Sequence, residues 1–144
     1  MTNQEILNFN KELEVLANHL VAKGTDNFTL NYAVDANFRR LKPVIQGIQK
    51  AVSPELVAIE KKAYELAHKD PEERTEEEVI KEGLTLLTDE EREQQKALMV
   101  KYNEDMAQEN TEFEVYKVDR KKIEDIKIDL PYIGILKKIL YEDN

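Results

Sequence analysis

The sequence predicts a mainly α-helical protein (α+β class) built on a long antiparallel helical hairpin. Three observations predict this fold. Apolar residues recur every three or four positions over most of the 144 residues, which is the spacing of one buried helix face. Glycine and proline number only four each, which favours long helices with short loops. From residue 112 onward the apolar period falls to two, which predicts a small β-ribbon, and a final helix follows.

A first helix is predicted from Asn3 to Ala22. Thr2 or Asn3 can cap its N-terminus, and Gly24 follows its last turn, where a left-handed residue is favoured. Its apolar residues step by three and four along one face: Ile6, Phe9, Leu13, Leu16 and Leu20. This face is expected to be buried.

The second predicted element is the longest and runs from Leu30 to His68. Ser53 followed by Pro54 has the pattern of a new helix start, yet the apolar phase does not change there. We therefore expect either one long kinked helix or two nearly collinear helices. The stripe consists of Leu30, Val34, Phe38, Leu41, Ile45, Ile48, Val52, Leu56, Ile59, Ala63 and Leu66.

Two further helices are predicted from capping patterns. Thr75 with Glu78 and Thr88 with Glu91 each fit a capping box. The first box predicts a short helix from Glu76 to Leu86. The second predicts a long helix from Asp89 to Asn110, which would run back along the 30–68 element and so form the hairpin.

The C-terminal region is predicted to close the base of the hairpin together with the N-terminal helix. Alternating apolar residues predict one strand at Thr111–Val118 and another around Ile126 and Ile128. Asp119 would cap a turn between them. Pro131 then opens a last helix with four inward residues: Ile133, Leu136, Ile139 and Leu140.

Charge is distributed unevenly along the chain. Residues 69–93 contain eleven acidic and four basic residues, which account for −7 of the net charge of −9. We expect residues 1–144 to form a single domain with 69–93 as its exposed acidic tip. Direct binding to nucleic acid is not expected, because it needs a basic face.

No catalytic or cofactor motif is recognisable. The chain has no cysteine, so it offers no disulfide, thiolate metal site or cysteine nucleophile. His19 and His68 have no metal-ligand spacing, and the single serine, Ser53, fits a helix cap. The glycines are isolated, so none forms a phosphate loop. We expect no enzyme activity, no cofactor and no metal.

The remaining candidates are charged side chains for partner binding. The acidic candidates are exposed carboxylates of the tip, and the basic ones belong to the cluster NFRRLK. A solvated acidic face is the simpler interpretation, and the arginines are expected to pair with the acidic segment of the same or a neighbouring chain. The candidate residues are Glu72, Glu73, Glu76, Glu77, Glu78, Arg39 and Arg40.

Three parts of the sequence together resemble an uncharacterised family of small phage and prophage proteins of Firmicutes. They are the leading helix, the segment FTLNYAVDANFRRLKPVIQGIQKA, and the ending EFEVYKVDRKKIEDIKIDLPYIGILKKILYED. The acidic stretch from Asp70 to Leu87 and the surroundings of Pro54 depart from the pattern. The resemblance implies a phage origin and carries over no catalytic residue.

These observations lead to two functional hypotheses. The first is a non-enzymatic phage protein that acts through protein–protein contacts, in virion assembly or as a minor structural or chaperone component. The second is a host-directed inhibitor that uses residues 70–93 against a basic surface. A small hydrolase is the weakest alternative. No window is apolar enough for a membrane span, so we expect a soluble protein of the host cytoplasm or the virion, with homo-oligomerisation left open.

Overall fold

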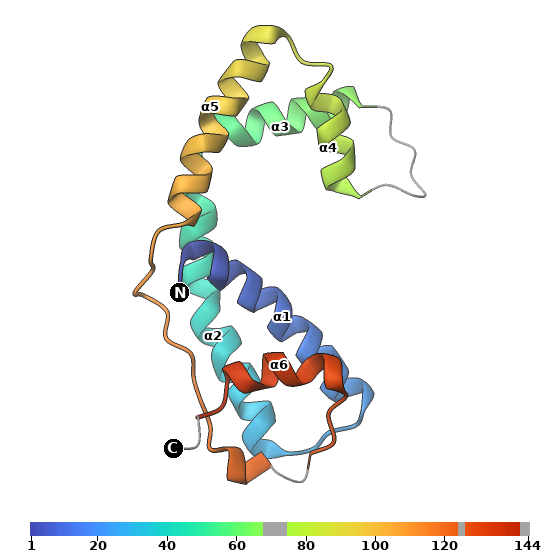
Figure 1. Ribbon diagram of the computed structural model, residues 1–144, viewed down its shortest axis with the longest axis vertical. Helices are drawn as coiled ribbons and strands as arrows, with labels where there is room; N and C mark the ends of the chain where they lie inside the picture. Colours follow the sequence, from blue (N-terminus) through green and yellow to red (C-terminus); the bar gives the residue numbers. More distant parts are fainter. Residues whose placement is uncertain (68–74, 124–125, 142–144) are drawn as a thin grey trace. The chain divides into compact units, whose positions relative to one another are not determined.

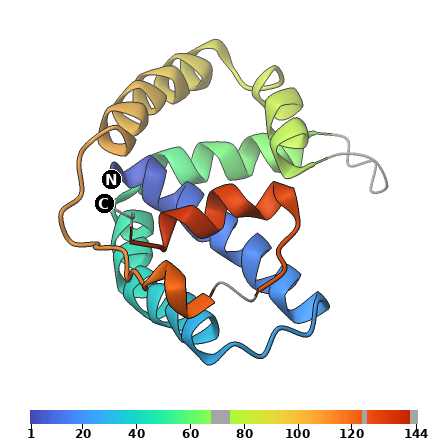
Figure 2. The ribbon, with the colours of Figure 1, turned by 60° about the horizontal axis from the view of Figure 1, so that its bottom comes forward.

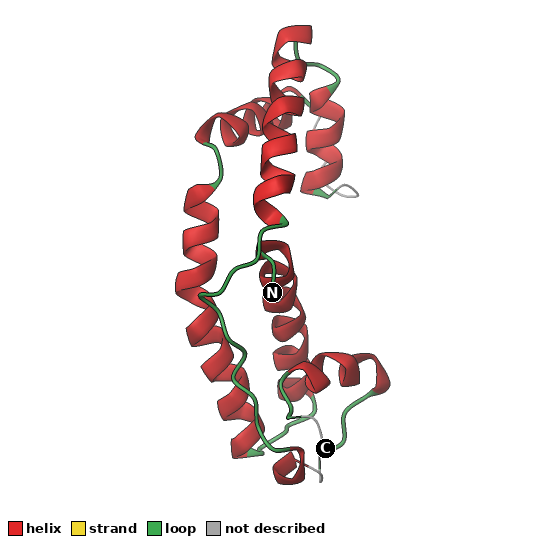
Figure 3. Cartoon of the chain, turned by 60° about the vertical axis from the view of Figure 1, so that its left-hand side comes forward, coloured by secondary structure: helices red, strands yellow, loops and turns green. Residues whose placement is uncertain are grey.

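The computed structural model describes residues 1–67, 75–123 and 126–141. Within these ranges the chain forms six α-helices and one short 3-10 helix, and no strand (Figures 1 and 3). The prediction of a mainly α protein is therefore confirmed. The contacts divide the chain into two compact units, and the single domain stays a prediction. Unit 1 comprises residues 1–48 and 108–144, and unit 2 comprises residues 49–107.

Unit 1 begins with α1 (Asn3–Ala22), whose bounds agree with the prediction. The Thr2 hydroxyl accepts a hydrogen bond from the Glu5 amide, and the Glu5 carboxylate accepts one from the Thr2 amide, at 3.1 and 2.8 Å. This capping box satisfies amides that the first turn leaves without partners. Gly24 has a φ of 64° and ends the helix as expected. All five residues of the predicted stripe are buried.

The second helix, α2 (Phe28–Ala51), contributes a second set of buried residues to the core of unit 1. It ends at Ala51, and α3 begins at Pro54, so the prediction of one continuous kinked helix is wrong. The Phe9 ring lies 5.8 Å from the ring of Phe113, which follows far along the chain. The largest fully buried apolar side chains of this core are Ile6, Phe9, Leu13, Leu16, Leu30, Leu41 and Ile139.

The last helix, α6 (Leu130–Lys138), packs against α1 (Figure 2). Near one end, the Lys138 ammonium lies 2.6 Å from the Glu12 carboxylate. Near the other, the Tyr132 ring stacks on His19 with centroids 3.9 Å apart. These pairs show that α6 runs antiparallel to α1. Its own residues are half-buried or exposed, and Ile139 and Leu140, just past its end, are the residues that enter the core.

The predicted β-ribbon is not present in the described residues. Residues 111–118 are extended but run alongside α2 without forming a ladder (Figures 1 and 3). Phe113 and Val118 are both buried, although residues five apart would lie on opposite faces of a strand. Side chains of α2 and the end of the chain satisfy the backbone here instead. Residues 126–129 are also irregular, and Asp119 caps the 3-10 helix η1 (Arg120–Ile123).

Unit 2 contains α3 (Pro54–Leu66), α4 (Glu76–Leu84) and α5 (Asp89–Met106). Helices α3 and α4 pack most closely, and α5 adds a smaller contact to α3. Thr75 and Thr88 cap α4 and α5; the predicted capping box is complete at Thr88 with Glu91, whereas at Thr75 the hydroxyl accepts from the Glu78 amide without the reciprocal bond, and both helices end a few residues earlier than expected. The core consists of Ile59, Ala63 and Leu87, with Ile80, Leu84 and Leu98 packed against it.

Glycine at position 83 permits the close crossing of α3 and α4. A Cβ atom there would lie 1.7 Å from the carbonyl oxygen of Ala63, which is far inside van der Waals contact. Ala63 itself is fully buried. The two small residues therefore let the helix backbones touch, and a larger residue at either position would separate the helices.

Candidate functional site

An aromatic groove of about 450 Å³ lies on the surface of unit 1. Phe28 is 78% exposed and Tyr141 is 61% exposed, so large rings face water here. A cluster of exposed apolar surface of this kind marks interaction sites in soluble proteins. The lining residues are Phe28, Thr29, Tyr32, Tyr116, Lys117, Val118, Asp119, Lys122 and Tyr141.

The rings of the groove are arranged by the first turns of α2. Phe28 and Tyr32 are four residues apart, which places them on one helix face, and their centroids are 5.9 Å apart. Tyr116 meets Tyr32 edge-on at 5.7 Å, a geometry that aromatic quadrupoles favour. Leu30 and Val34 point into the core instead. The start of α2 thus has one face in the core and one aromatic face outside.

Two predicted candidates, Arg39 and Arg40, extend this aromatic surface. Arg39 lies over the Tyr32 ring, 5.6 Å from its centroid, and its side chain is 2.9 Å from the Asp35 carboxylate. Arg40 lies 5.2 Å from the Tyr116 centroid and donates to the carbonyl oxygen of Glu114 at 3.1 Å. These cation–π contacts and local bonds hold both guanidinium groups, and their pairing with the acidic segment of the same or a neighbouring chain stays a prediction.

Asn37 fixes Tyr116 in place, and this buried amide has no exposed surface. Its Oδ1 accepts from the Tyr116 amide at 2.8 Å, and its Nδ2 donates to the Tyr116 carbonyl oxygen at 3.0 Å. The same Nδ2 also donates to the carbonyl oxygen of Ala33. The Asn37 side chain therefore pairs with the backbone of the extended segment, as the backbone of a neighbouring strand would. A buried amide is stable in this position because its hydrogen bonds are satisfied.

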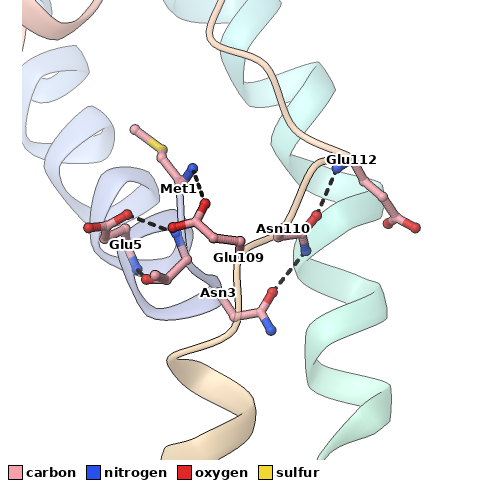
Figure 4. Close-up of polar contacts among 7 residues, drawn as sticks. Met1, Asn3, Glu5, Glu109, Asn110 and Glu112 are labelled. Carbon is pink, nitrogen blue, oxygen red and sulfur yellow. Dashed lines mark hydrogen bonds and ion pairs between the residues drawn. The ribbon is translucent and has the colours of Figure 1, made fainter.

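Both ends of the extended segment are also anchored. At the start, the Met1 ammonium lies 3.3 Å from the Glu109 carboxylate (Figure 4). There the Asn110 Nδ2 donates to the Asn3 Oδ1 at 2.8 Å. At the other end, the Val118 amide donates to the Ile139 carbonyl, and the Tyr141 amide donates to the Val118 carbonyl, both at 3.0 Å. The second pair positions the Tyr141 ring beside the groove.

Lysines give the groove a cationic side. Lys117 and Lys122 line it, and among the described residues neither forms an ion pair. Asp119 lies nearby and accepts a hydrogen bond from the Lys121 amide. A second hollow of about 580 Å³ holds Lys138 and Glu12, which pair with each other. Lys117 also lines this second hollow, together with Lys137, and neither of them forms an ion pair among the described residues.

The acidic candidates lie in unit 2 or outside the described residues. Glu76, Glu77 and Glu78 form the first turn of α4 and are exposed. Their negative charges interact favourably with the positive end of the helix dipole. The Glu78 amide donates to the Thr75 hydroxyl at 3.2 Å. Glu72 and Glu73 lie outside the described residues.

The pKa values of two carboxyl groups in unit 2, Glu91 and Glu60, are shifted in opposite directions. A hydrogen bond from Lys62, at 2.6 Å, and others from Thr88 lower the pKa of Glu91. Partial burial raises the pKa of Glu60. The Lys62–Glu91 pair joins α3 to α5, so the lowered pKa reports a structural contact.

The histidine and serine candidates have structural surroundings. His19 is buried, its Nε2 accepts from the Asp129 amide at 3.4 Å, and the Asp129 carboxylate lies 3.9 Å away. Ser53 precedes α3 but makes no side-chain cap bond, and His68 lies outside the described residues. In residues 1–67, 75–123 and 126–141, no group of three His, Cys, Asp or Glu could hold a metal. No helix in those ranges is long and apolar enough to cross a bilayer.

Sequence patterns alone missed the aromatic groove. Phe28 and Tyr32 stand outside the buried stripe of α2, and an off-stripe aromatic pair four residues apart was the available signal. Tyr116 and Tyr141 had no such signal, because their positions depend on contacts between segments far apart in the chain. Comparison with known proteins adds no assignment: no family model, no curated protein and no solved structure matches the chain.

Proposed function

We propose that the chain is a non-enzymatic protein that binds other proteins through the aromatic groove of unit 1. The observation that carries this proposal is the exposure of Phe28 and Tyr141 beside Tyr32, Tyr116 and two lysines that form no ion pair within the part of the chain that the structure describes. Covering such rings on binding is favourable by about 25 cal/mol per Å² of apolar surface. Tyrosine and arginine are also the residues that most often dominate binding energy at protein interfaces.

A preformed groove favours binding because little ordering is needed. Asn37, the N-terminal anchor and the Ile139–Val118–Tyr141 bonds hold the extended segment before any partner arrives. Each side chain immobilised on binding costs about 0.5–1.5 kcal/mol, and several groove residues are already restrained. The groove is therefore suited to recognition of an extended or helical segment a few residues long.

The resemblance to phage and prophage proteins supports a phage origin for this binding function. We infer a role in virion assembly, or as a minor structural or chaperone component, in the host cytoplasm or the virion. The support is the sequence pattern together with a surface built for contact rather than chemistry. In this role the groove would bind a phage protein during assembly.

A peptide-display selection on the purified chain tests the groove directly. The expected result is a set of peptides that bind wild type and lose at least about tenfold affinity for Tyr32→Ala and Phe28→Ser. The matched controls are Val15→Ala and Val21→Ser, which change exposed apolar residues of α1 outside the groove. Peptides that bind all four variants equally would refute the proposal.

One observation favours the inhibitor alternative. Glu76, Glu77 and Glu78 are exposed and adjacent on α4, and such a cluster could bind a basic host surface. Triple reversal to lysine should then abolish a salt-sensitive complex with a host nucleic-acid-binding protein. The groove variants should leave that complex unchanged, and the opposite pattern would exclude this alternative.

A further inference from the structure

We propose that the extended segment of unit 1 binds an extended segment of another protein as an added β-strand. The contact would be made by the backbone groups of Phe113, Val115 and Lys117, which we call the open edge. Of these residues only Lys117 also lines the aromatic groove. The inference therefore goes beyond the proposed function and concerns a second binding surface.

The backbone hydrogen bonds of this segment alternate along the chain. Within residues 112–118 the bonded backbone groups belong to Glu112, Glu114, Tyr116 and Val118. Those of residues 113, 115 and 117 form no bond with any described part of the chain. Successive residues of an extended chain direct their N–H and C=O groups to opposite sides. One side is therefore bonded within unit 1, and the other side is unpaired.

The spacing of the unpaired groups is the spacing that an added strand needs. In an antiparallel pair, every second residue exchanges both of its backbone bonds with the partner strand. The open edge offers such positions at residues 113, 115 and 117, over about 14 Å at ~3.4 Å per residue. Exposed edges of this kind bind extended peptides through main-chain hydrogen bonds. The bonds on the opposite side already hold the segment, so little ordering is needed on binding.

Two hollows lie along the open edge and leave room for a strand. One, of about 430 Å³, has Phe113, Val115 and Lys117 in its lining. The other is the hollow of about 580 Å³ described above, which Val115 and Lys117 also line. Figures 1 and 3 show the segment on the outside of unit 1, beside α2. The unpaired backbone groups and the accessible space therefore coincide.

The larger hollow has cations that its own carboxylates do not neutralise. Glu12 is paired with Lys138 at 2.6 Å, and Glu5 accepts the Thr2 amide in the capping box of α1. The two other lysines of the lining form no ion pair in the described ranges, and they are Lys117 and Lys137. A carboxylate on the added strand would be attracted by both.

These features define the chemistry of the occupant. An acidic residue is favoured opposite Lys117, because opposite charges across a strand pair are stabilising. An apolar residue two positions away would lie on the same strand face, against Val115 and Leu140 of the hollow. A second copy of the chain would not provide this pattern, since its own open edge carries no carboxylate. The expected occupant is therefore an acidic and apolar extended segment of a different protein.

A peptide-display selection in which the aromatic groove is disabled tests the open edge. The bait is the full chain carrying Phe28→Ser and Tyr32→Ala, so that peptides dependent on the groove are not recovered. We expect enrichment of peptides with an acidic residue two positions from an apolar one. In the complex, amide exchange at Val115 and Lys117 should slow at least about tenfold by NMR. A selection without enrichment, or binding that leaves both amides in fast exchange, would overturn the inference.

N-methylation of a selected peptide separates strand pairing from a contact of side chains alone. Methyl groups are placed on one peptide amide at a time. Amides that face the open edge should lose at least about tenfold affinity when methylated, and the amides between them should lose little. The losses should therefore alternate along the peptide. Equal effects at all positions, or none, would contradict strand addition.

Proline substitutions remove single amides from the protein. Lys117→Pro deletes an N–H group of the open edge, and the matched control Glu114→Pro deletes one on the bonded side; both residues are exposed. Lys117→Gln keeps the amide and removes only the charge. Peptide binding should fall at least about tenfold further in Lys117→Pro than in Lys117→Gln, and Glu114→Pro should retain it. Equal binding by Lys117→Pro and Lys117→Gln would refute the backbone contact, and the N-methylation series decides if the proline variants fail to fold.

Sedimentation velocity on the wild-type chain tests a second copy as the occupant. We expect no self-association that protects the Lys117 amide. A dimer in which this amide exchanges slowly would show that a second copy covers the open edge, and the inference of a different protein would fail. Peptides selected on the aromatic groove would still bind in that case, so the proposed function is judged separately.

Discussion

Units 1 and 2 are built in different ways from the same kind of amphipathic helix. Unit 1 surrounds Phe9, Leu13 and Leu41 with side chains from four separate segments, and all three are fully buried or nearly so. Unit 2 has a small core around Ile59, Ala63 and Leu87, and it depends on one close backbone crossing at Gly83. Burial of apolar area is the main source of stability, so unit 1 should be the more stable of the two.

The difference teaches where a binding surface can be placed. A groove that exposes four aromatic rings needs a frame that does not collapse around them. Unit 1 supplies this frame through contacts such as Asn37 with Tyr116, which link residues 79 positions apart. In unit 2 the Lys62–Glu91 side-chain bond links residues 29 positions apart, and both of its groups lie on exposed parts of the surface. Unit 2 instead carries −7 of the net charge of −9.

The largest expected effect comes from the core of unit 1. Phe9→Ala should destabilise the protein by about 3–5 kcal/mol, because it removes a buried ring and leaves a cavity. Chemical denaturation followed by circular dichroism measures the loss. Val15→Ala, at an exposed position of the same helix, is the control and should change stability little. Equal losses for both variants would contradict the assigned core.

The second-largest loss of stability is expected from replacing the buried amide of Asn37. Asn37→Leu removes both hydrogen bonds to Tyr116, and each buried polar group left unsatisfied costs about 1–3 kcal/mol. Asn37→Asp keeps an acceptor for the Tyr116 amide but loses the donor to its carbonyl. Asn37→Leu should also weaken the binding of peptides selected on the groove. Full stability and full peptide binding in Asn37→Leu would show that Tyr116 is held by other contacts.

Two glycine substitutions compare the units by the sign of the effect. Gly83→Ala should destabilise unit 2 by about 1–3 kcal/mol, because the new Cβ meets the Ala63 carbonyl and overpacks the crossing. Gly47→Ala lies in α2, where a Cβ would meet nothing within 4 Å. It should stabilise its helix by up to about 1 kcal/mol. Residue-resolved hydrogen exchange separates the two effects, and a stabilising Gly83→Ala would disprove the close crossing.

The smallest expected effect is a pH dependence within unit 2. The folded-state pKa of Glu91 is below its ordinary value of 4.5, chiefly because Lys62 donates a hydrogen bond to it. The stabilisation is therefore present above the unfolded pKa and is lost as pH falls through the folded pKa. Glu91→Gln should remove this acid-range slope from denaturation midpoints of unit 2. An unchanged slope would show that the Lys62 contact does not affect stability.

The sequence predicted local structure well where local rules decide it. The bounds of α1, the Gly24 stop, the two threonine caps and the start of α3 at Pro54 follow from spacing and capping chemistry. The β-ribbon was wrong because alternation in residues 111–118 reflects contacts with α2 rather than with another strand. Asn37 appeared only as a polar position within a helical segment, although it decides how that segment is bound.

The candidate site was less predictable for the same physical reason. Arg39 and Arg40 were identified from their charge, but their partners, Tyr32 and Tyr116, come from segments that only the fold brings together. The two-unit arrangement was also not foreseen. The apolar stripe of residues 30–66 keeps one phase, so it does not indicate that its first part packs in unit 1 and its second part in unit 2. Periodicity defines the faces of helices, and tertiary contacts decide what covers them.

The central claim is that the aromatic groove is preformed by the packing of unit 1. Amide hydrogen exchange at Tyr116 and Lys117, measured by NMR on the free protein, tests it most directly. The Tyr116 amide donates to the Asn37 Oδ1, whereas no hydrogen bond of the Lys117 amide is recorded among the described residues. We predict strong protection at Tyr116 and fast exchange at Lys117. Equally fast exchange at both amides would contradict the claim, because the segment would then be free before any partner binds.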